Sequence, residues 1–123
     1  MRNAILLVPL ALVACGGSGS SSASSVVTLQ PGGANPAAIS VLGGAQMEFI
    51  NADAIDHQIA SSDCPELNSP RLAAVAESRS TSSFLATLGA QPKICTFADG
   101  LHPSSTTFQG TVTVQQPPGR SGY

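Results

Sequence analysis

The stretch QMEFINADAIDHQIA, residues 46–60, decides the fold. It begins with a candidate strand that follows a Gly-Gly turn signal, and it closes on a second candidate strand, 55–60. Because alternate side chains of a strand share a face, Ile55, His57 and Ile59 are expected on the same side. The sequence therefore predicts a strand that directs a histidine toward an apolar core.

Similar short segments, rich in β-branched and apolar residues and separated by Pro and Gly, flank this stretch. Together the candidate strands occupy 26–30, 38–42, 46–50, 55–60, 80–87, 93–97 and 109–115. About seven strands at this spacing are typical of an all-β sandwich or Greek-key barrel. By alternation, Val112 and Val114 should face inward, and Cys95 should share an inward face with Phe97.

The composition limits the function. The 123 residues suffice for one domain, and 42% hydrophobic residues can build its core. Only 10% of the residues are charged, with a formal net charge of −2 and no basic cluster, so nucleic acid is not an expected partner. No G-x-S-x-G turn or familiar zinc spacing is present, and the chain is not expected to be an enzyme.

The N-terminus has the features of an export signal. Arg2 precedes an apolar run of eleven residues, 4–14, which is well short of the roughly 20 residues that span a bilayer. The run ends in Leu-Val-Ala-Cys-Gly, which resembles the lipobox of bacterial lipoproteins. The resemblance implies a signal peptide at 1–14, lipidation of Cys15, and a protein anchored to a membrane of the bacterial cell envelope, facing the periplasm or on the outer membrane.

The segments beside the candidate domain carry little to bury. Residues 15–25 are almost entirely Gly and Ser after the cysteine, which predicts a flexible tether, and 117–123 are expected to be a flexible tail. The folded domain is therefore expected at 26–116.

Three motifs within this domain resemble the cupredoxins, the family of blue type 1 copper proteins that includes plastocyanin. Residues 49–57 match the pattern F-x-N-x-D-x-x-x-H, 63–68 match D-C-P-x-[IL]-N, and 110–114 read G-T-V-T-V. The resemblance covers about 38–115 and implies a cupredoxin-like Greek-key β-sandwich.

The resemblance also implies a copper site. His57 corresponds to the first imidazole ligand and Cys95 to the thiolate, and His102 is the candidate second imidazole. A thiolate with two imidazoles suits both oxidation states of copper, so the implied function is electron transfer, with a redox partner protein, or copper handling. Six residues lie between Cys95 and His102, whereas cupredoxins usually have two to four, and the axial ligand is either Gln109 or absent.

Counting cysteines gives an alternative. With Cys15 lipidated, Cys64 and Cys95 form an even pair, which suggests a disulfide in an exported protein. A thiol in a disulfide cannot bind copper as a thiolate, so the two predictions for Cys95 exclude each other. The alternative function is a metal-free structural or interaction module of the same fold, stabilised by this disulfide.

Overall fold

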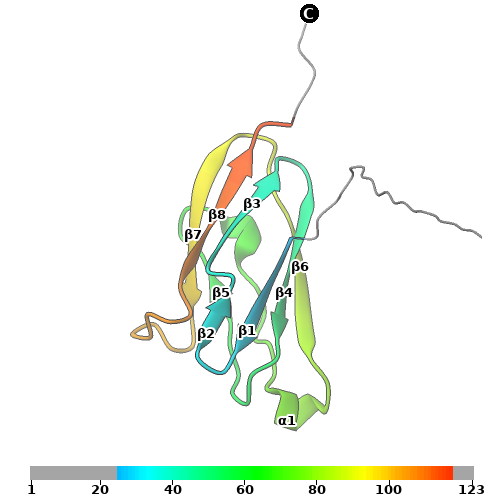
Figure 1. Ribbon diagram of the computed structural model, residues 1–123, viewed down its shortest axis with the longest axis vertical. Helices are drawn as coiled ribbons and strands as arrows, with labels where there is room; N and C mark the ends of the chain where they lie inside the picture. The colour runs from blue at the N-terminus through cyan, green and yellow to red at the C-terminus, as the bar shows by residue number, and fades with distance from the viewer. Residues whose placement is uncertain (1–24, 118–123) are drawn as a thin grey trace, which may run out of the picture.

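The computed structural model describes residues 25–117 as two four-stranded β-sheets packed face to face (Figure 1). The predicted signal peptide at 1–14, the lipidated Cys15 and almost all of the tether lie outside the described residues, as does the tail beyond Pro117. Among the helices of residues 25–117, none has the length and apolar character needed to cross a membrane.

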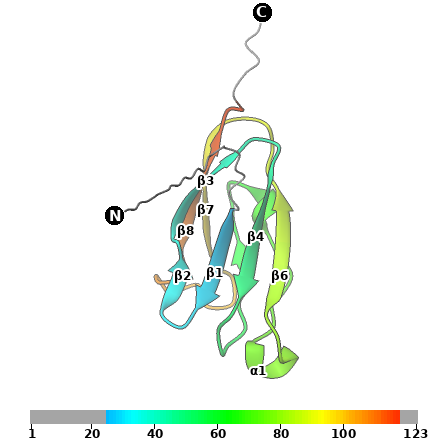
Figure 2. The ribbon, with the colours of Figure 1, turned by 45° about the vertical axis from the view of Figure 1, so that its right-hand side comes forward.

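The first sheet holds four strands in the order β2-β1-β4-β6. Their bounds are β1 (Val26–Gln30), β2 (Gly33–Asn35), β4 (Gln46–Asn51) and β6 (Ser82–Thr87). β1 pairs with β2 and β4 pairs with β6 in antiparallel fashion, but β1 and β4 are parallel. Between β1 and β4 the chain therefore leaves this sheet and returns to it (Figure 2).

The second sheet has the order β3-β8-β7-β5. Its strands are β3 (Ala38–Leu42), β5 (Ile59–Ala60), β7 (Lys93–Asp99) and β8 (Gly110–Gln115). β3 and β8 are parallel, whereas β8 with β7 and β7 with β5 are antiparallel. Two short helices, η1 (Pro65–Leu67) and α1 (Val75–Ser78), lie in the connection between β5 and β6. The predicted all-β sandwich is confirmed.

Alternation along the strands builds the core between the sheets. Cys95 and Phe97 are both buried on β7, and Val112 and Val114 are both buried on β8, as the sequence predicts. The ring of Phe49 on β4 meets the ring of Phe97 edge to face, with centroids 5.2 Å apart. Because these rings come from opposite sheets, this contact joins the two layers.

Two elements differ from the prediction. β2 was not expected, because its three residues, Gly33–Asn35, contain no β-branched side chain and follow a Pro-Gly turn. The predicted strand 55–60 is reduced to Ile59–Ala60, and Ile55 is 46% exposed instead of facing the core. His57 makes only an isolated bridge to Leu72, yet it is fully buried.

Candidate metal centre

The buried side chain of Asn51 shapes the loop that follows β4. Its amide nitrogen donates to the carbonyl oxygens of Leu72 (2.9 Å), Ile55 (3.0 Å) and Ala73 (3.2 Å), and its oxygen accepts from the backbone N–H of Asp53 (2.9 Å). These bonds turn the chain back on itself, which explains why Ile55 does not continue a strand. They also fix the path from β4 to His57.

This loop places His57 in the interior. The backbone N–H of His57 donates to the carbonyl of Leu72 (3.1 Å), and the N–H of Leu72 donates back (2.7 Å). The imidazole is fully buried, and its centroid lies 4.2 Å from that of the Phe108 ring. Its Nε2 is 2.8 Å from Asp53 Oδ2, and its Nδ1 is 2.5 Å from Asp99 Oδ2. His57 therefore lies between two carboxylates.

Asp99 is the last residue of β7 and is only 1% exposed. Its Oδ1 accepts from the backbone N–H groups of Leu101 (2.9 Å) and Gln58 (3.2 Å), while its Oδ2 faces His57 and His102. Burial raises the pKa of Asp99, but the contacts with the two histidines and these backbone donors outweigh it, so the pKa lies below its usual value. Asp99 is thus a buried carboxylate held in its charged form.

His102 completes the cluster from the loop after β7. Its backbone N–H donates to the carbonyl of Asp99 (3.2 Å), and this turn brings its Nδ1 to 2.9 Å from Asp99 Oδ2. The side chain is 44% exposed, unlike its two partners. One ligand atom from each of His57, Asp99 and His102 lies within 4.8 Å of the other two. The structure therefore brings both histidines singled out in the sequence together, but around a carboxylate.

Cys95 lies elsewhere. It is on the same strand as Asp99 but four residues earlier, about 13 Å along β7. Its sulfur is bonded to Cys64, with the two Cα atoms 5.6 Å apart, and both residues are fully buried. This corrects the expectation that Cys95 ligates copper, because its sulfur is not available as a thiolate. The alternative expectation, a Cys64–Cys95 disulfide, is what the structure contains.

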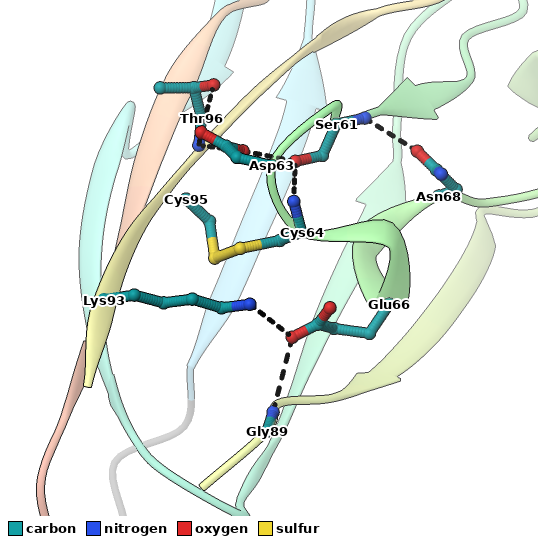
Figure 3. The surroundings of a disulfide bond; sticks show 9 residues. All are labelled: Ser61, Asp63, Cys64, Glu66, Asn68, Gly89, Lys93, Cys95 and Thr96. Carbon is teal, nitrogen blue, oxygen red and sulfur yellow. Dashed lines mark hydrogen bonds and ion pairs between the residues drawn. A yellow bond between two sulfur atoms is a disulfide. The ribbon is translucent and has the colours of Figure 1, made fainter. Parts of the chain in front are cut away.

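Polar contacts on both sides of the disulfide hold the segment around Cys64 against β7 (Figure 3). On one side, the carboxylate of Asp63 accepts from the backbone N–H (3.0 Å) and hydroxyl (3.1 Å) of Thr96. On the other side, Glu66 pairs with Lys93 (3.6 Å) and accepts from the backbone N–H of Gly89 (3.4 Å). The D-C-P-x-L-N motif thus has a structural role in this chain, since its residues fasten a loop to β7.

Asp53 and Asp99 are the residues that the sequence analysis missed. The signal for Asp99 was present: two residues separate it from His102, which is within the cysteine-to-histidine spacing expected of cupredoxins. The resemblance assigns the sulfur ligand to Cys95, so a carboxylate at residue 99 is not among the expected ligands. Asp53 belongs to the F-x-N-x-D-x-x-x-H motif, but only the fold shows that its carboxylate reaches His57.

Comparison with known proteins supports the same fold. No family model matches the sequence, and no curated protein matches it either. Among solved structures, a purple cupredoxin from Nitrosopumilus maritimus has 19% identity and a TM-score of 0.60 over 75% of this chain and 100% of its own. Oxidized plastocyanin from Dryopteris crassirhizoma has 25% identity and a TM-score of 0.58 over 74% of this chain and 100% of its own.

A third similar structure is a copper-containing nitrite reductase from Thermus scotoductus, with 20% identity and a TM-score of 0.61. The match covers 85% of this chain but only 25% of the reductase. The protein described here therefore has a cupredoxin-like fold, a β-sandwich that it shares with a purple cupredoxin, with plastocyanin and with part of the larger nitrite reductase.

The donor set determines which form of copper fits. A blue copper centre needs a cysteine thiolate, and within residues 25–117 both cysteines are joined in the disulfide. Two imidazoles and one carboxylate are suitable ligands for Cu(II). The residues present therefore fit a copper ion held by nitrogen and oxygen, and they do not fit a thiolate-bound one.

Proposed function

We propose that this chain is an exported, lipid-anchored, cupredoxin-like protein that binds one copper ion through His57, Asp99 and His102. Its role is to hold and hand over copper, and not to catalyse a reaction. The proposal rests on one observation: a ligand atom from each of two imidazoles and one carboxylate lies within 4.8 Å of the other two. These side chains come from two segments that are over 40 residues apart in the sequence.

The ligand atoms are arranged for capture of an ion from solution. His57 and Asp99 are buried and held by backbone hydrogen bonds, so they provide a rigid half of the site. His102 is partly exposed and lies on a loop, which gives an ion access from solvent. Bound copper would supply a Lewis-acidic, redox-active centre. Copper(II) also binds most strongly among the common divalent ions to such ligands.

The proposed cell-envelope location rests on two features. The lipobox-like sequence ends at Cys15, outside the described residues, and the buried Cys64–Cys95 disulfide is typical of oxidising compartments outside the cytoplasm. Metabolic labelling with an alkyne fatty acid should mark the wild-type protein in a bacterial host. The Cys15→Ala variant should carry no label, and equal labelling of both would refute lipidation at this residue.

Titration of the purified protein with Cu(II) tests the copper proposal. We expect one tightly bound ion per chain, an electron paramagnetic resonance signal of nitrogen- and oxygen-bound copper, and no intense thiolate-to-copper band. His102→Ala should weaken binding about 100-fold, because one of three protein ligands is lost from an exposed position that the fold does not need. Lys93→Ala, a change at the end of β7 opposite Asp99, is the control. Equal binding by wild type and His102→Ala would reject the site.

A second candidate function is a metal-free interaction module. The observation that favours it is that both ring nitrogens of His57 already contact carboxylates, so the cluster is internally satisfied without an ion. This candidate predicts no stoichiometric copper and no rise in Tm when copper is added. In both cases, thiol titration of the unfolded, unreduced chain should detect no free thiol from Cys64 or Cys95.

A further inference from the structure

We infer that the cluster selects copper in the divalent state over the monovalent state, with Asp99 as a ligand and Asp53 as a positioning residue that acts through His57. This inference rests on the proposed copper site and specifies its cargo as Cu(II). It follows from the donor atoms, the charge of the buried groups and the second contact of His57.

The donor atoms favour the higher oxidation state. Soft thiolate and thioether ligands select Cu(I), whereas carboxylate oxygen is a hard donor. In the cluster, the atom that faces both imidazoles is the carboxylate oxygen Oδ2 of Asp99. The sole methionine of the described chain, Met47, is buried on β4 and belongs to the hydrophobic core, and the two cysteines are in a disulfide. No soft ligand of the described chain joins the cluster.

The charge of the buried carboxylates also favours Cu(II) over Cu(I). Asp53 is 6% exposed and Asp99 is 1% exposed, so two negative charges flank a fully buried imidazole. Among the ion pairs of the described residues, those of Asp53 and Asp99 are with His57 and His102, while Arg71 pairs with Asp56 and Glu77 and Lys93 pairs with Glu66. A divalent ion neutralises two carboxylates, while a monovalent ion leaves one buried negative charge uncompensated, which is unfavourable.

Asp53 also determines how His57 is presented. Its Oδ2 lies 2.8 Å from Nε2 of His57, and its Oδ1 accepts from the backbone N–H of Ala54 (2.6 Å). The side chain of Asn51 holds the Asp53 backbone in turn. When an ion takes the place of the hydrogen between Nδ1 and Asp99, the carboxylate of Asp53 still accepts the N–H of Nε2, which makes Nδ1 the ligand atom and the imidazole a stronger donor. Nδ1 is the nitrogen that faces Asp99.

The test is a pair of competition titrations on the whole protein. Copper(II) is titrated against a colorimetric chelator, and copper(I) is titrated anaerobically against bathocuproine disulfonate. The wild type should bind Cu(II) more tightly than Cu(I). Asp99→Asn should lower the affinity for Cu(II) about 100-fold while changing that for Cu(I) less than about threefold.

The Asp53→Asn variant tests the role of the Asp53 charge without changing the orientation of the His57 ring. Its amide oxygen can still accept from Nε2, so the ring orientation is kept while the charge is lost. We expect the ratio of Cu(II) to Cu(I) affinity to fall about 10-fold. Asp56→Asn is the matched control, because Asp56 is a neighbouring carboxylate that contacts Arg71 and Ala74 and not His57. It should leave the ratio unchanged.

The possible outcomes distinguish the selectivity for Cu(II) from the existence of the copper site. If copper binds but the wild type prefers Cu(I), or if Asp53→Asn leaves the ratio at the wild-type value, the selectivity inference is overturned while the copper site stands. If neither ion binds, the proposed function itself falls. Should Asp99→Asn fail to fold, the wild-type preference and the Asp53→Asn ratio still decide the question.

Discussion

At the scale of single residues, the proposed copper chemistry depends on the identity of residue 99. Asp99 ends β7 beside two imidazoles, and two residues separate it from His102, which is within the spacing that cupredoxins have between their cysteine and second histidine. The sequence allowed both histidines to be predicted, because histidines are rare in this chain and one lies in a recognisable motif. At Cys95 the sequence left copper ligation and a disulfide with Cys64 as alternatives, since nothing in it distinguishes a ligand sulfur from a disulfide sulfur.

Replacing the carboxylate should change the type of copper bound. In Asp99→Cys, a thiolate would lie beside His57 and His102, and we expect Cu(II) to produce an intense visible thiolate-to-copper absorption that the wild type lacks. Visible absorption spectroscopy after addition of one equivalent of Cu(II) is the measurement. Asp99→Ser is the control, because it also replaces the carboxylate but supplies no thiolate and leaves the Cys64–Cys95 disulfide intact. A colourless Asp99→Cys protein that binds copper would contradict the assignment of residue 99 as a ligand.

Asn51 is the residue on which the site loop depends. Its buried amide satisfies three carbonyl groups and one backbone N–H. Asn51→Ala should lower the free energy of unfolding by about 3 kcal/mol, because the carbonyls of Ile55 and Ala73 and the N–H of Asp53 lose the bonds to this side chain; the carbonyl of Leu72 keeps only its bond from His57. Urea denaturation measures the change. Gln46→Ala, an exposed change on the same strand, should have an effect of less than about 0.5 kcal/mol, and equal effects would refute the role of Asn51.

At the scale of elements, β7 connects the disulfide to the cluster. Cys95, Phe97 and Asp99 alternate along its buried face, so a single strand carries a covalent link to the loop around Cys64, a core ring and a candidate ligand. Alternation in the sequence predicted the burial of the first two. It could not predict that the strand extends to Asp99, because Ala98 and Asp99 are weak strand formers that are held here by pairing with β5.

β8 lies so close to its neighbours at Gly110 that one added methyl group should destabilise the protein. A Cβ at Gly110 would overlap the carbonyl oxygen of Ala37 and lie 2.6 Å from a ring carbon of Phe97. Gly110→Ala should therefore destabilise the protein by about 3 kcal/mol in chemical denaturation. At Gly89 the nearest atom would be 3.7 Å away, so Gly89→Ala should be tolerated. A fully stable Gly110→Ala protein would show that the register of β8 is different.

At the scale of the whole molecule, the two sheets bring distant loops together at one end. β4 and β7 run toward the same end of the sandwich in Figure 1, so the loops that follow them carry His57 and His102 to a common place. Strand count and turn spacing predicted a sandwich. The parallel pairing of β1 with β4 and of β3 with β8 joins segments far apart in the chain, and local patterns contain no information on such pairs.

The stability of the whole domain in acid should depend on its hydrogen-bonded carboxylates. The pKa values of Asp56, Asp63, Glu66 and Asp99 all lie below their usual values. The backbone N–H of Ala74 is the main cause for Asp56, and that of Thr96 is the main cause for Asp63. Groups whose pKa is lowered by folding stabilise the protein above the unfolded pKa and lose this effect as the pH falls through the folded value.

The urea midpoint should therefore hold steady down to about pH 5 and decrease as the pH falls through about 4 and below, toward the lowered pKa values of the folded state. Asp63→Asn, which removes one of these carboxylates and leaves the core unchanged, should show a weaker pH dependence than the wild type. A midpoint that rises on acidification would contradict the assigned direction.

The position of the bound ion tests the central claim most directly. Crystals of the protein grown with one equivalent of copper should show a single anomalous peak at the copper absorption edge. The peak should lie about 2.0 to 2.2 Å from Nδ1 of His57, Nδ1 of His102 and the carboxylate of Asp99. The Cys64–Cys95 disulfide should be intact in the same crystals. A copper peak on the sulfur of Cys95, or none within reach of His57 and Asp99, would contradict the account.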